Sequence, residues 1–190
     1  MNERIILASQ SPRRKQLLEW AEVEFDVMVK ETDELYPSTL DIEKIPVYIA
    51  RNKALAVKDE LMHDRIILAA DTIVVLNDEV IGKPSGREAA IETLSKLSGN
   101  IHQVITGVVL LRGEEEYSFE DVTEVQFHDL TQEQIAYYVD HYKPYDKAGA
   151  YAIQEWIGVI GIKRISGDFY NVMGLPVSRV VKALRQFAEE

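Results

Sequence analysis

Three consecutive cations, Arg13, Arg14 and Lys15, stand where a helix is expected to begin. Ser11 is a suitable N-cap and Pro12 a suitable first helical residue, so the cations fall in the first helical turn. The helix dipole disfavours each cation there by roughly 0.3 to 1 kcal/mol. Free backbone N–H groups and guanidinium groups together suit a phosphate-bearing ligand. The cluster favours an anion site, and the alternative is a solvated basic turn or arginines paired with acids of the chain.

An acidic residue, Asp71, interrupts the most apolar stretch of the chain, residues 65–76. This stretch predicts a central strand, so Asp71 is either desolvated or placed at the mouth of a cleft. An unpaired buried carboxylate is costly, and a cation, a metal ion or a proton is therefore expected beside it. Asp71 is a candidate general base, metal ligand, or both. The alternative is a structural ion pair with an interior Arg or Lys.

Weaker candidates lie at the end of a short predicted strand and on predicted loops. Lys83, between a glycine and a proline, is held on a rigid segment, although such a tripeptide is usually a surface turn. The acidic residues Glu31, Asp33 and Glu34 offer hard oxygen ligands for magnesium, although acidic clusters are more often solvated. Gln154 carries an amide that both donates and accepts, which suits the edge of a base, and its alternative is an ordinary turn residue.

The elements that must position these residues alternate between strands and helices. Strands are predicted at residues 5–8, 65–76, 80–84, 102–111, 117–127 and 156–165. Helices are predicted at residues 12–20, 46–57, 87–97, 131–142 and 176–187. The second helix carries Arg51 and Lys53, and a capping box at Thr131 begins the fourth. The strands at 102–111 and 117–127 flank a turn and are expected to be antiparallel. We therefore expect one α/β domain over residues 1–190 with a mixed sheet.

Composition limits the function classes. The 190 residues are 46% hydrophobic with a net charge of −11, so a folded core is expected and attraction to nucleic acid or anionic lipid is not. There are no cysteines, which leaves oxygen or nitrogen ligands for any metal. Neither a signal peptide nor a long apolar span is evident, and a cytoplasmic protein without nucleic-acid or membrane partners is expected.

Taken together, these segments resemble the Maf family of nucleoside triphosphate pyrophosphatases over essentially the whole chain. The matching motifs, in the family's order, are Leu7–Arg14, Ala50–Ala54, Ala70–Thr72, Gly82–Pro84, Asp146–Tyr151 with Gln154, and Val172–Pro176. The resemblance implies the inosine triphosphatase-like (Maf/Ham1) fold, an elongated two-lobed mixed sheet flanked by helices with a central cleft. It also implies an enzyme that hydrolyses an acid anhydride. The substrate is a nucleoside triphosphate, which is cleaved at the α-phosphate to give the monophosphate and pyrophosphate. The expected cofactor is a divalent cation, Mg²⁺ or Mn²⁺.

The resemblance also suggests roles for single residues. Asp71 matches the position assigned as proton acceptor. Arg13, Thr72 and Gln154 match the trio of the branch that acts on dTTP and UTP, in contrast to the branch that acts on 7-methyl-GTP. A pyrimidine triphosphate, canonical or modified, is therefore the expected substrate.

From these matches we expect the site residues to have different roles. The residues expected to hold the triphosphate are Arg13, Arg14, Lys53 and Lys83, of which Lys53 and Lys83 join Asp71 as catalytic groups. Ser9 is also expected to bind the substrate. Asp71 and Glu34 are expected to ligate the metal, with Asp71 orienting or deprotonating the attacking water.

Two positions depart from the family pattern, Ala152 and Glu155, where glycine is common in the family. Glu155 is expected to change the charge beside the base. Family members have also been linked to arrest of septum formation, so a nucleotide-binding regulator with slow or incidental hydrolysis is the alternative function. The oligomeric state does not follow from the sequence, which leaves a homodimer open.

Overall fold

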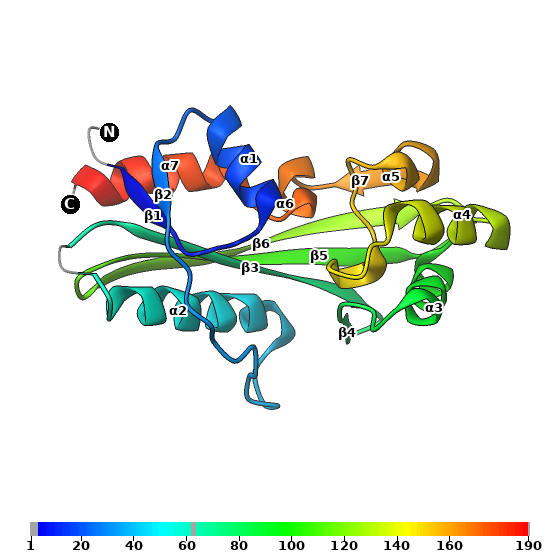
Figure 1. Cartoon of the computed structure of the whole chain (residues 1–190), viewed down its shortest axis with the longest axis horizontal. Coiled ribbons are helices and arrows are strands. Elements are labelled where there is room, and N and C mark those ends of the chain that lie inside the picture. The colour runs from blue at the N-terminus through cyan, green and yellow to red at the C-terminus, as the bar shows by residue number, and fades with distance from the viewer. Residues whose placement is uncertain (1–3, 62–63, 190) are drawn as a thin grey trace. The chain divides into compact units, whose positions relative to one another are not determined.

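The computed structural model describes residues 4–61 and 64–189 and shows a mixed α/β fold with one sheet flanked by helices (Figure 1). The strands are β1 (Ile5–Leu7), β2 (Phe25–Val27), β3 (Ile67–Leu76), β4 (Glu79–Ile81), β5 (Ile101–Arg112), β6 (Glu115–Phe127) and β7 (Ile162–Ser166). The α-helices are α1 (Pro12–Trp20), α2 (Ile45–Lys58), α3 (Arg87–Leu97), α4 (Gln132–Tyr142), α5 (Trp156–Gly161), α6 (Phe169–Met173) and α7 (Val177–Glu189). Two short 3₁₀ helices are η1 (Ile42–Lys44) and η2 (Ala148–Ala150).

The sheet is mixed, as the sequence predicts. Its strand order in the described residues is β2-β1-β3-β5-β6-β7, with β4 paired to β3 outside this path. Strand β1 pairs in parallel with both β2 and β3, whereas the β3–β4 and β6–β7 pairs are antiparallel. Strands β5 and β6 are neighbours joined by two residues, a connection short enough only for antiparallel strands. The predicted hairpin is thus confirmed.

The chain divides into two compact units, and neither unit is one continuous segment. Unit one comprises the described residues of 1–72, 106–121 and 174–190, and unit two comprises residues 73–105 and 122–173. The boundaries fall inside β3, β5 and β6, so these three strands contribute residues to both units.

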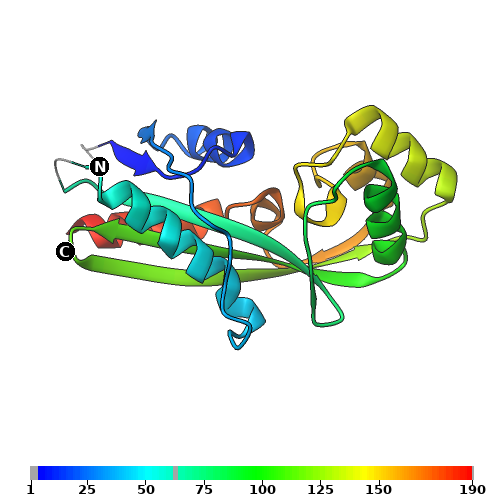
Figure 2. The ribbon, with the colours of Figure 1, turned by 60° about the horizontal axis from the view of Figure 1, so that its bottom comes forward.

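One core cluster of unit one lies between the sheet and helix α2. Apolar residues of α2, including Val47, Ala50 and Ala54, pack with residues of β1, β3 and β5. Figures 1 and 2 show α2 and α7 on opposite faces of this part of the sheet. A Cβ atom at Gly107 of β5 would lie 2.1 Å from the Val47 backbone nitrogen, so only glycine allows α2 to approach so closely. This contact fixes the start of the helix that carries Lys53.

The core of unit two joins the other halves of the long strands to helices α3, α4 and α5. Val74, Val104 and Val125 form one buried cluster, and α3 contacts both α4 and η2. Beside them His102 stacks on Phe127, and its ring nitrogen Nε2 lies 2.7 Å from the Tyr151 hydroxyl. This unit therefore holds an aromatic core with a buried polar pair.

One element prediction is wrong, and two short elements were not predicted. The apolar segment from Trp156 is not a single strand, because Trp156–Gly161 forms α5 and only Ile162–Ser166 pairs with β6 as β7. The short strand β2 and helix α6 were not expected. An apolar run of this length fits a buried helix as well as a strand, and tertiary packing decides between them.

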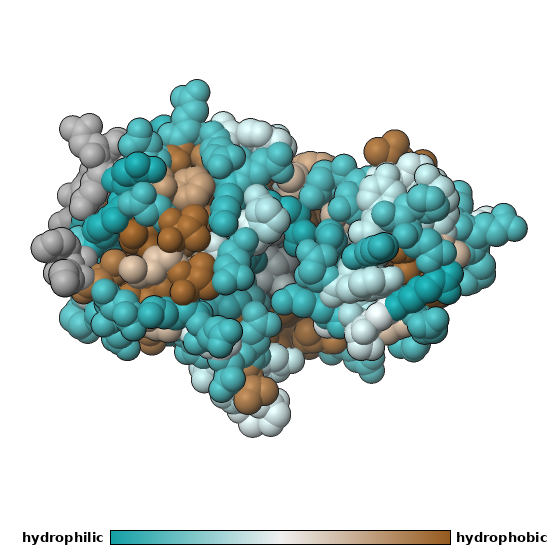
Figure 3. All heavy atoms as spheres, viewed as in Figure 1, coloured by the Kyte–Doolittle hydropathy of each residue, from teal (hydrophilic) through white to brown (hydrophobic). Residues whose placement is uncertain are grey.

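The hydrophilic character of the surface agrees with the high content of charged residues in the sequence. The face seen in Figure 3 is largely hydrophilic, with hydrophobic side chains exposed in places. In the described part of the chain, no helix has the length and apolar character needed to cross a membrane.

Candidate active site

The cationic helix start is present as predicted. The Ser11 side chain accepts a hydrogen bond from the Arg14 backbone N–H at 3.4 Å, Pro12 begins α1, and no acidic residue lies in its first turn. Arg13 is half-buried, whereas Arg14 is buried with 8% exposure. The two arginines therefore have different environments although they are adjacent.

Arg14 forms a buried hydrogen-bond network that joins three parts of unit one. Its Nε donates to the Gly174 carbonyl at 2.8 Å, and its terminal nitrogens donate to Ser9 Oγ at 3.1 Å and Thr72 Oγ1 at 2.9 Å. Thr72 Oγ1 lies 2.9 Å from Thr106 Oγ1 on β5. These contacts fix α1 and β3 against the segment that precedes α7. Because guanidinium has five N–H groups and these bonds use three, Arg14 retains donors for a ligand.

The electrostatics of Arg14 reflect its burial. Desolvation lowers the pKa of Arg14, and the positive charge of Arg13 adds to that effect, while the negative charges of Asp71 and Glu34 raise it. The charges of the cationic helix start and of the carboxylates thus act on one another within unit one. Arginine stays protonated under such conditions, so Arg14 is a permanent cation of the site.

A second cluster, the carboxylate–lysine cluster, comprises Glu34, Lys53 and Asp71. Lys53 Nζ donates to Asp71 Oδ1 at 2.7 Å and to Glu34 Oε1 at 2.9 Å. The side chains of Asp71 and Lys53 are 13% and 19% exposed, whereas that of Glu34 is 52% exposed. The expectation that Asp71 needs a cation is confirmed, and the pair remains accessible to a ligand.

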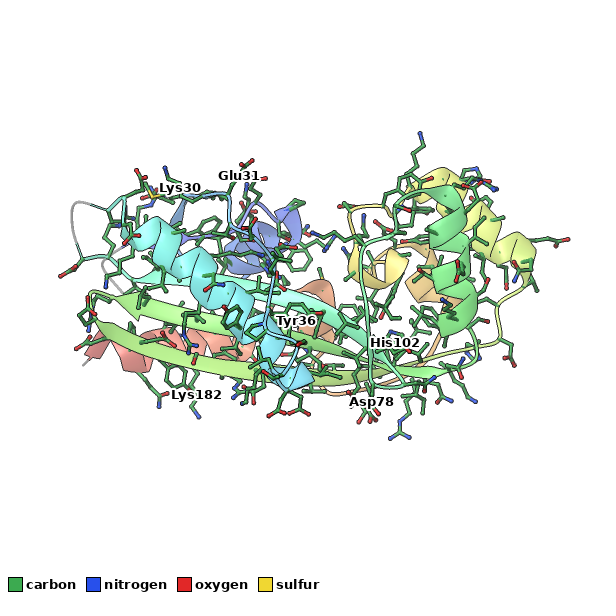
Figure 4. The ribbon with its side chains drawn as sticks, turned by 90° about the horizontal axis from the view of Figure 1, so that it is seen from below. Lys30, Glu31, Tyr36, Asp78, His102 and Lys182 are labelled. Carbon is green, nitrogen blue, oxygen red and sulfur yellow. The ribbon has the colours of Figure 1, made fainter. Side chains whose placement is uncertain are left out.

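The local sequence explains how this cluster is positioned. Asp71 and Thr72 are the two half-buried residues in the middle of β3, whose other residues are all buried. Lys53 lies on α2, whose start is fixed against Gly107. Glu34 comes from the loop between β2 and η1, on which Figure 4 also labels Glu31 and Tyr36. A strand, a helix and a loop thus each contribute one charged group.

Unit two carries the other predicted site residues. Lys83 follows β4 and is exposed, and Gln154 is exposed on the segment between η2 and α5. The Gly149 backbone N–H donates to the Gly82 carbonyl at 3.3 Å, so the segment that precedes Lys83 contacts η2 directly. In unit one, by contrast, the structure brings predicted site residues together in two groups. One group is Ser9, Arg14 and Thr72. The other is Glu34, Lys53 and Asp71.

The donor set suits a hard divalent cation. Oxygens from Glu34 and Asp71 converge on one ammonium group, so a cation is already held between two carboxylates. Mg²⁺ is commonly bound by one or two carboxylates together with substrate phosphates. No group of three or more His, Asp or Glu residues that could hold a metal occurs within residues 4–61 and 64–189. Phosphate oxygens would therefore have to complete any such site.

Two residues near the site were not singled out from the sequence. Thr106 is fully buried and contacts Thr72, and the only sequence signal is a hydroxyl residue within an apolar strand. Tyr138 on α4 contacts both Ala152 and Glu155. Glu155 was noted only for its charge, and its carboxylate faces Tyr138 and Lys147. Contacts between segments far apart in sequence leave no local pattern.

Comparison with known proteins first defines the fold. A HAM1 protein from Coxiella burnetii matches 96% of this chain and 98% of its own, with a TM-score of 0.51 and 15% identity. The molecule is thus an α/β protein with a HAM1-like fold that carries clustered cations and carboxylates. Residues 4–187 match the family model described as Maf-like protein, and the chain belongs to the Maf family.

Curated relatives support this assignment over nearly the full length. A protein of Cytophaga hutchinsonii named dTTP/UTP pyrophosphatase is 54% identical, over 97% of this chain and 84% of the relative. A protein of Parabacteroides distasonis with the same name is 49% identical, over 97% and 96% respectively. One from Bacteroides fragilis, also of that name, is 49% identical over 96% and 95%.

Proposed function

We propose that the chain is a nucleoside triphosphate pyrophosphatase that hydrolyses dTTP and UTP at the α-phosphate. The main observation behind this proposal is that Lys53 bonds the carboxylates of Asp71 and Glu34 in the same unit as the cationic start of α1. The names of relatives about 50% identical over nearly the whole chain support the same activity. Fixed cations suit a triphosphate, whose cleavage depends mainly on positioning and electrostatic stabilisation.

The proposed reaction is an attack by water on the α-phosphorus. Asp71 orients the water and accepts a proton from it, while the bond between the α-phosphorus and the bridging oxygen breaks. Pyrophosphate leaves with the electron pair of that bond, and the nucleoside monophosphate remains. Arg13, Arg14 and Lys53 bind phosphate oxygens and stabilise the charge that develops on the leaving group.

We also propose a divalent cation, Mg²⁺ or Mn²⁺, held by Asp71 and Glu34 together with the triphosphate. When bound, it neutralises negative charge on the leaving pyrophosphate. Lys53 is then free to contact phosphate oxygens, because its two carboxylate partners have another cation to bind.

Base recognition is assigned to Arg13, Thr72 and Gln154, and Lys83 is assigned to the phosphates. Lys83 and Gln154 lie in unit two, whereas Arg13 and Thr72 lie in unit one. The likeness to the HAM1 protein supports the proposal of an inosine triphosphatase-like (Maf/Ham1) fold. A free nucleotide as substrate, with no nucleic-acid or membrane partner, fits the net charge of −11 and a proposed cytoplasmic location.

The test is a product assay. Purified protein with Mg²⁺ or Mn²⁺ is offered canonical and modified triphosphates, and pyrophosphate and orthophosphate are measured separately. Pyrophosphate release that is fastest with dTTP and UTP is expected. Orthophosphate as the first product would contradict the cleavage position, and no turnover on any nucleotide would favour a binding role instead.

A further inference from the structure

Gln154 is the exposed residue of a tight turn. The Glu155 N–H donates to the Ala152 carbonyl at 3.1 Å, which closes a β-turn with Ile153 and Gln154 at its centre. Ala152 and Ile153 are buried, whereas Gln154 is exposed. The turn therefore presents the Gln154 side chain to solvent from a packed backbone.

One hydroxyl group connects the two ends of this turn. Tyr138 on α4 is fully buried, and its oxygen accepts a hydrogen bond from the Ala152 N–H at 3.1 Å. The same hydroxyl donates to a carboxylate oxygen of Glu155. Since Ala152 is the first residue of the turn and Glu155 the last, Tyr138 holds both from outside the turn.

Glu155 is constrained from a second direction. Its other carboxylate oxygen lies 3.9 Å from Lys147 Nζ, on a side chain that is only 11% exposed. The Glu155 carbonyl accepts hydrogen bonds from the Gly158 and Val159 N–H groups at 2.9 and 3.3 Å, at the start of α5. The expectation that Glu155 adds charge beside the base thus needs refinement, because its carboxylate is partnered by a hydroxyl and a cation.

The backbone of α5 also rests directly on the turn. A Cβ atom at Gly158 would lie 1.7 Å from the Ile153 carbonyl oxygen, a distance that only glycine avoids. The turn thus lies between α4 and α5, with its backbone groups bonded on both sides. Such support fixes the direction in which the Gln154 side chain leaves the turn.

We propose that Tyr138 and Glu155 are positioning residues that set the specificity for the base by holding the Gln154 turn. This inference rests on the proposed function, in which the Gln154 amide reads the pyrimidine edge. An amide discriminates strongly only when it is held where a wrong base leaves buried donors or acceptors unpaired. Loosening the turn should therefore reduce discrimination more than it reduces the rate of the chemical step.

The first experiment tests the anchoring without any assay of activity. Amide hydrogen exchange is measured on the full chain for Tyr138→Phe and for the control Tyr142→Phe, which makes the same change on the same helix. Faster exchange at Ala152 and Glu155 is expected in Tyr138→Phe alone. Equal exchange in both variants and the parent protein would overturn the anchoring.

The second experiment tests the consequence for specificity. For Tyr138→Phe, the ratio of kcat/KM for dTTP to that for dCTP or dGTP should fall about tenfold, mostly through KM, with kcat within about twofold. Glu155→Ala should lower this selectivity ratio in the same way as Tyr138→Phe. Glu155→Gln keeps an acceptor for the Tyr138 hydroxyl, so it should retain most of the parent protein's selectivity ratio. A uniform fall in kcat for every nucleotide would contradict a positioning role.

A double-mutant cycle makes the test specific to Gln154. If Tyr138 acts through the amide, adding Tyr138→Phe to Gln154→Ala should cause no further loss of selectivity. Additive losses would overturn the inference. Absence of pyrophosphate release by the unmodified protein would instead contradict the proposed function, and the exchange experiment would still report on the anchoring.

Discussion

The ammonium group of Lys53 lies 2.7 Å from a carboxylate oxygen of Asp71, in the middle of a strand that is buried except at Asp71 and Thr72. The pair is 19% and 13% exposed, so it is sheltered from water but not sealed from it. A purely structural ion pair gains little from such accessibility, whereas a base that must meet a water molecule requires it. The placement supports the catalytic assignment of Asp71.

Asp71→Asn is expected to lower kcat by about 10² to 10⁴, because an amide cannot accept the proton of the attacking water. The amide oxygen still accepts a hydrogen bond from Lys53, so the free energy of unfolding should change by no more than about 1 kcal/mol. Steady-state kinetics and urea denaturation check both values. Turnover close to that of the parent protein would remove Asp71 from the mechanism.

Substitutions of Arg13 and Arg14 should differ in their effects on stability and on KM. Arg14→Met removes the buried hydrogen bonds that Arg14 donates to Ser9, Thr72 and the Gly174 carbonyl, so a loss of about 3 kcal/mol in unfolding free energy is expected. Arg13→Met should change stability by less than about 1 kcal/mol and raise KM for dTTP. Urea denaturation and kinetics on both variants make the comparison. Equal destabilisation by the two changes would contradict the assigned difference.

Gly107→Ala should destabilise the protein by about 3 kcal/mol or more, because the new methyl group would overlap the backbone of α2 at Val47. Gly86→Ala is the matched control, since a Cβ atom there meets nothing within 4 Å. The midpoint of thermal unfolding measures both. A mutant with the stability of the control would show that α2 can shift at no cost.

The buried His102 on β5, labelled in Figure 4, should make stability depend on acid. Burial lowers the pKa of His102 from 6.5 to about 4, so the unfolded chain binds a proton more readily than the folded one. Stability from this group is complete above pH 6.5 and is lost as the pH falls towards 4. The loss should reach about 2 kcal/mol at pH 5.

Urea denaturation at pH 7 and pH 5 measures this dependence. His102→Gln, which does not titrate, should lose about 2 kcal/mol less over this interval than the parent protein. The exposed His141, changed in the same way, serves as the control. An unchanged pH dependence in His102→Gln would contradict the assignment.

Local signals predicted the elements well where local chemistry decides them. Helix α3 has the predicted bounds, and the capping box at Thr131 forms as expected at the start of α4. The segment Trp156–Gly161 was predicted wrongly, because its apolar residues fit either state and the packing of Gly158 on Ile153 is not visible in sequence. Element boundaries set by tertiary contacts could not be derived.

In the candidate site, too, local chemistry was predictable from the sequence and tertiary contacts were not. Burial predicted a cation, a metal ion or a proton beside Asp71, and the structure places the cation Lys53 there. The identity of that cation depends on how α2 packs over β3, which a single sequence does not encode locally. The contacts of Thr106 with Thr72 and of Tyr138 with Glu155 join distant segments, so no spacing rule could have found them.

Because β3, β5 and β6 each supply residues to both compact units, no single cut of the polypeptide releases either unit as an intact fragment. Truncation at any loop removes backbone partners from a strand that the remaining part still needs. The two halves should therefore melt in one cooperative transition. An engineer who wishes to exchange one unit for that of another protein must graft several segments at once.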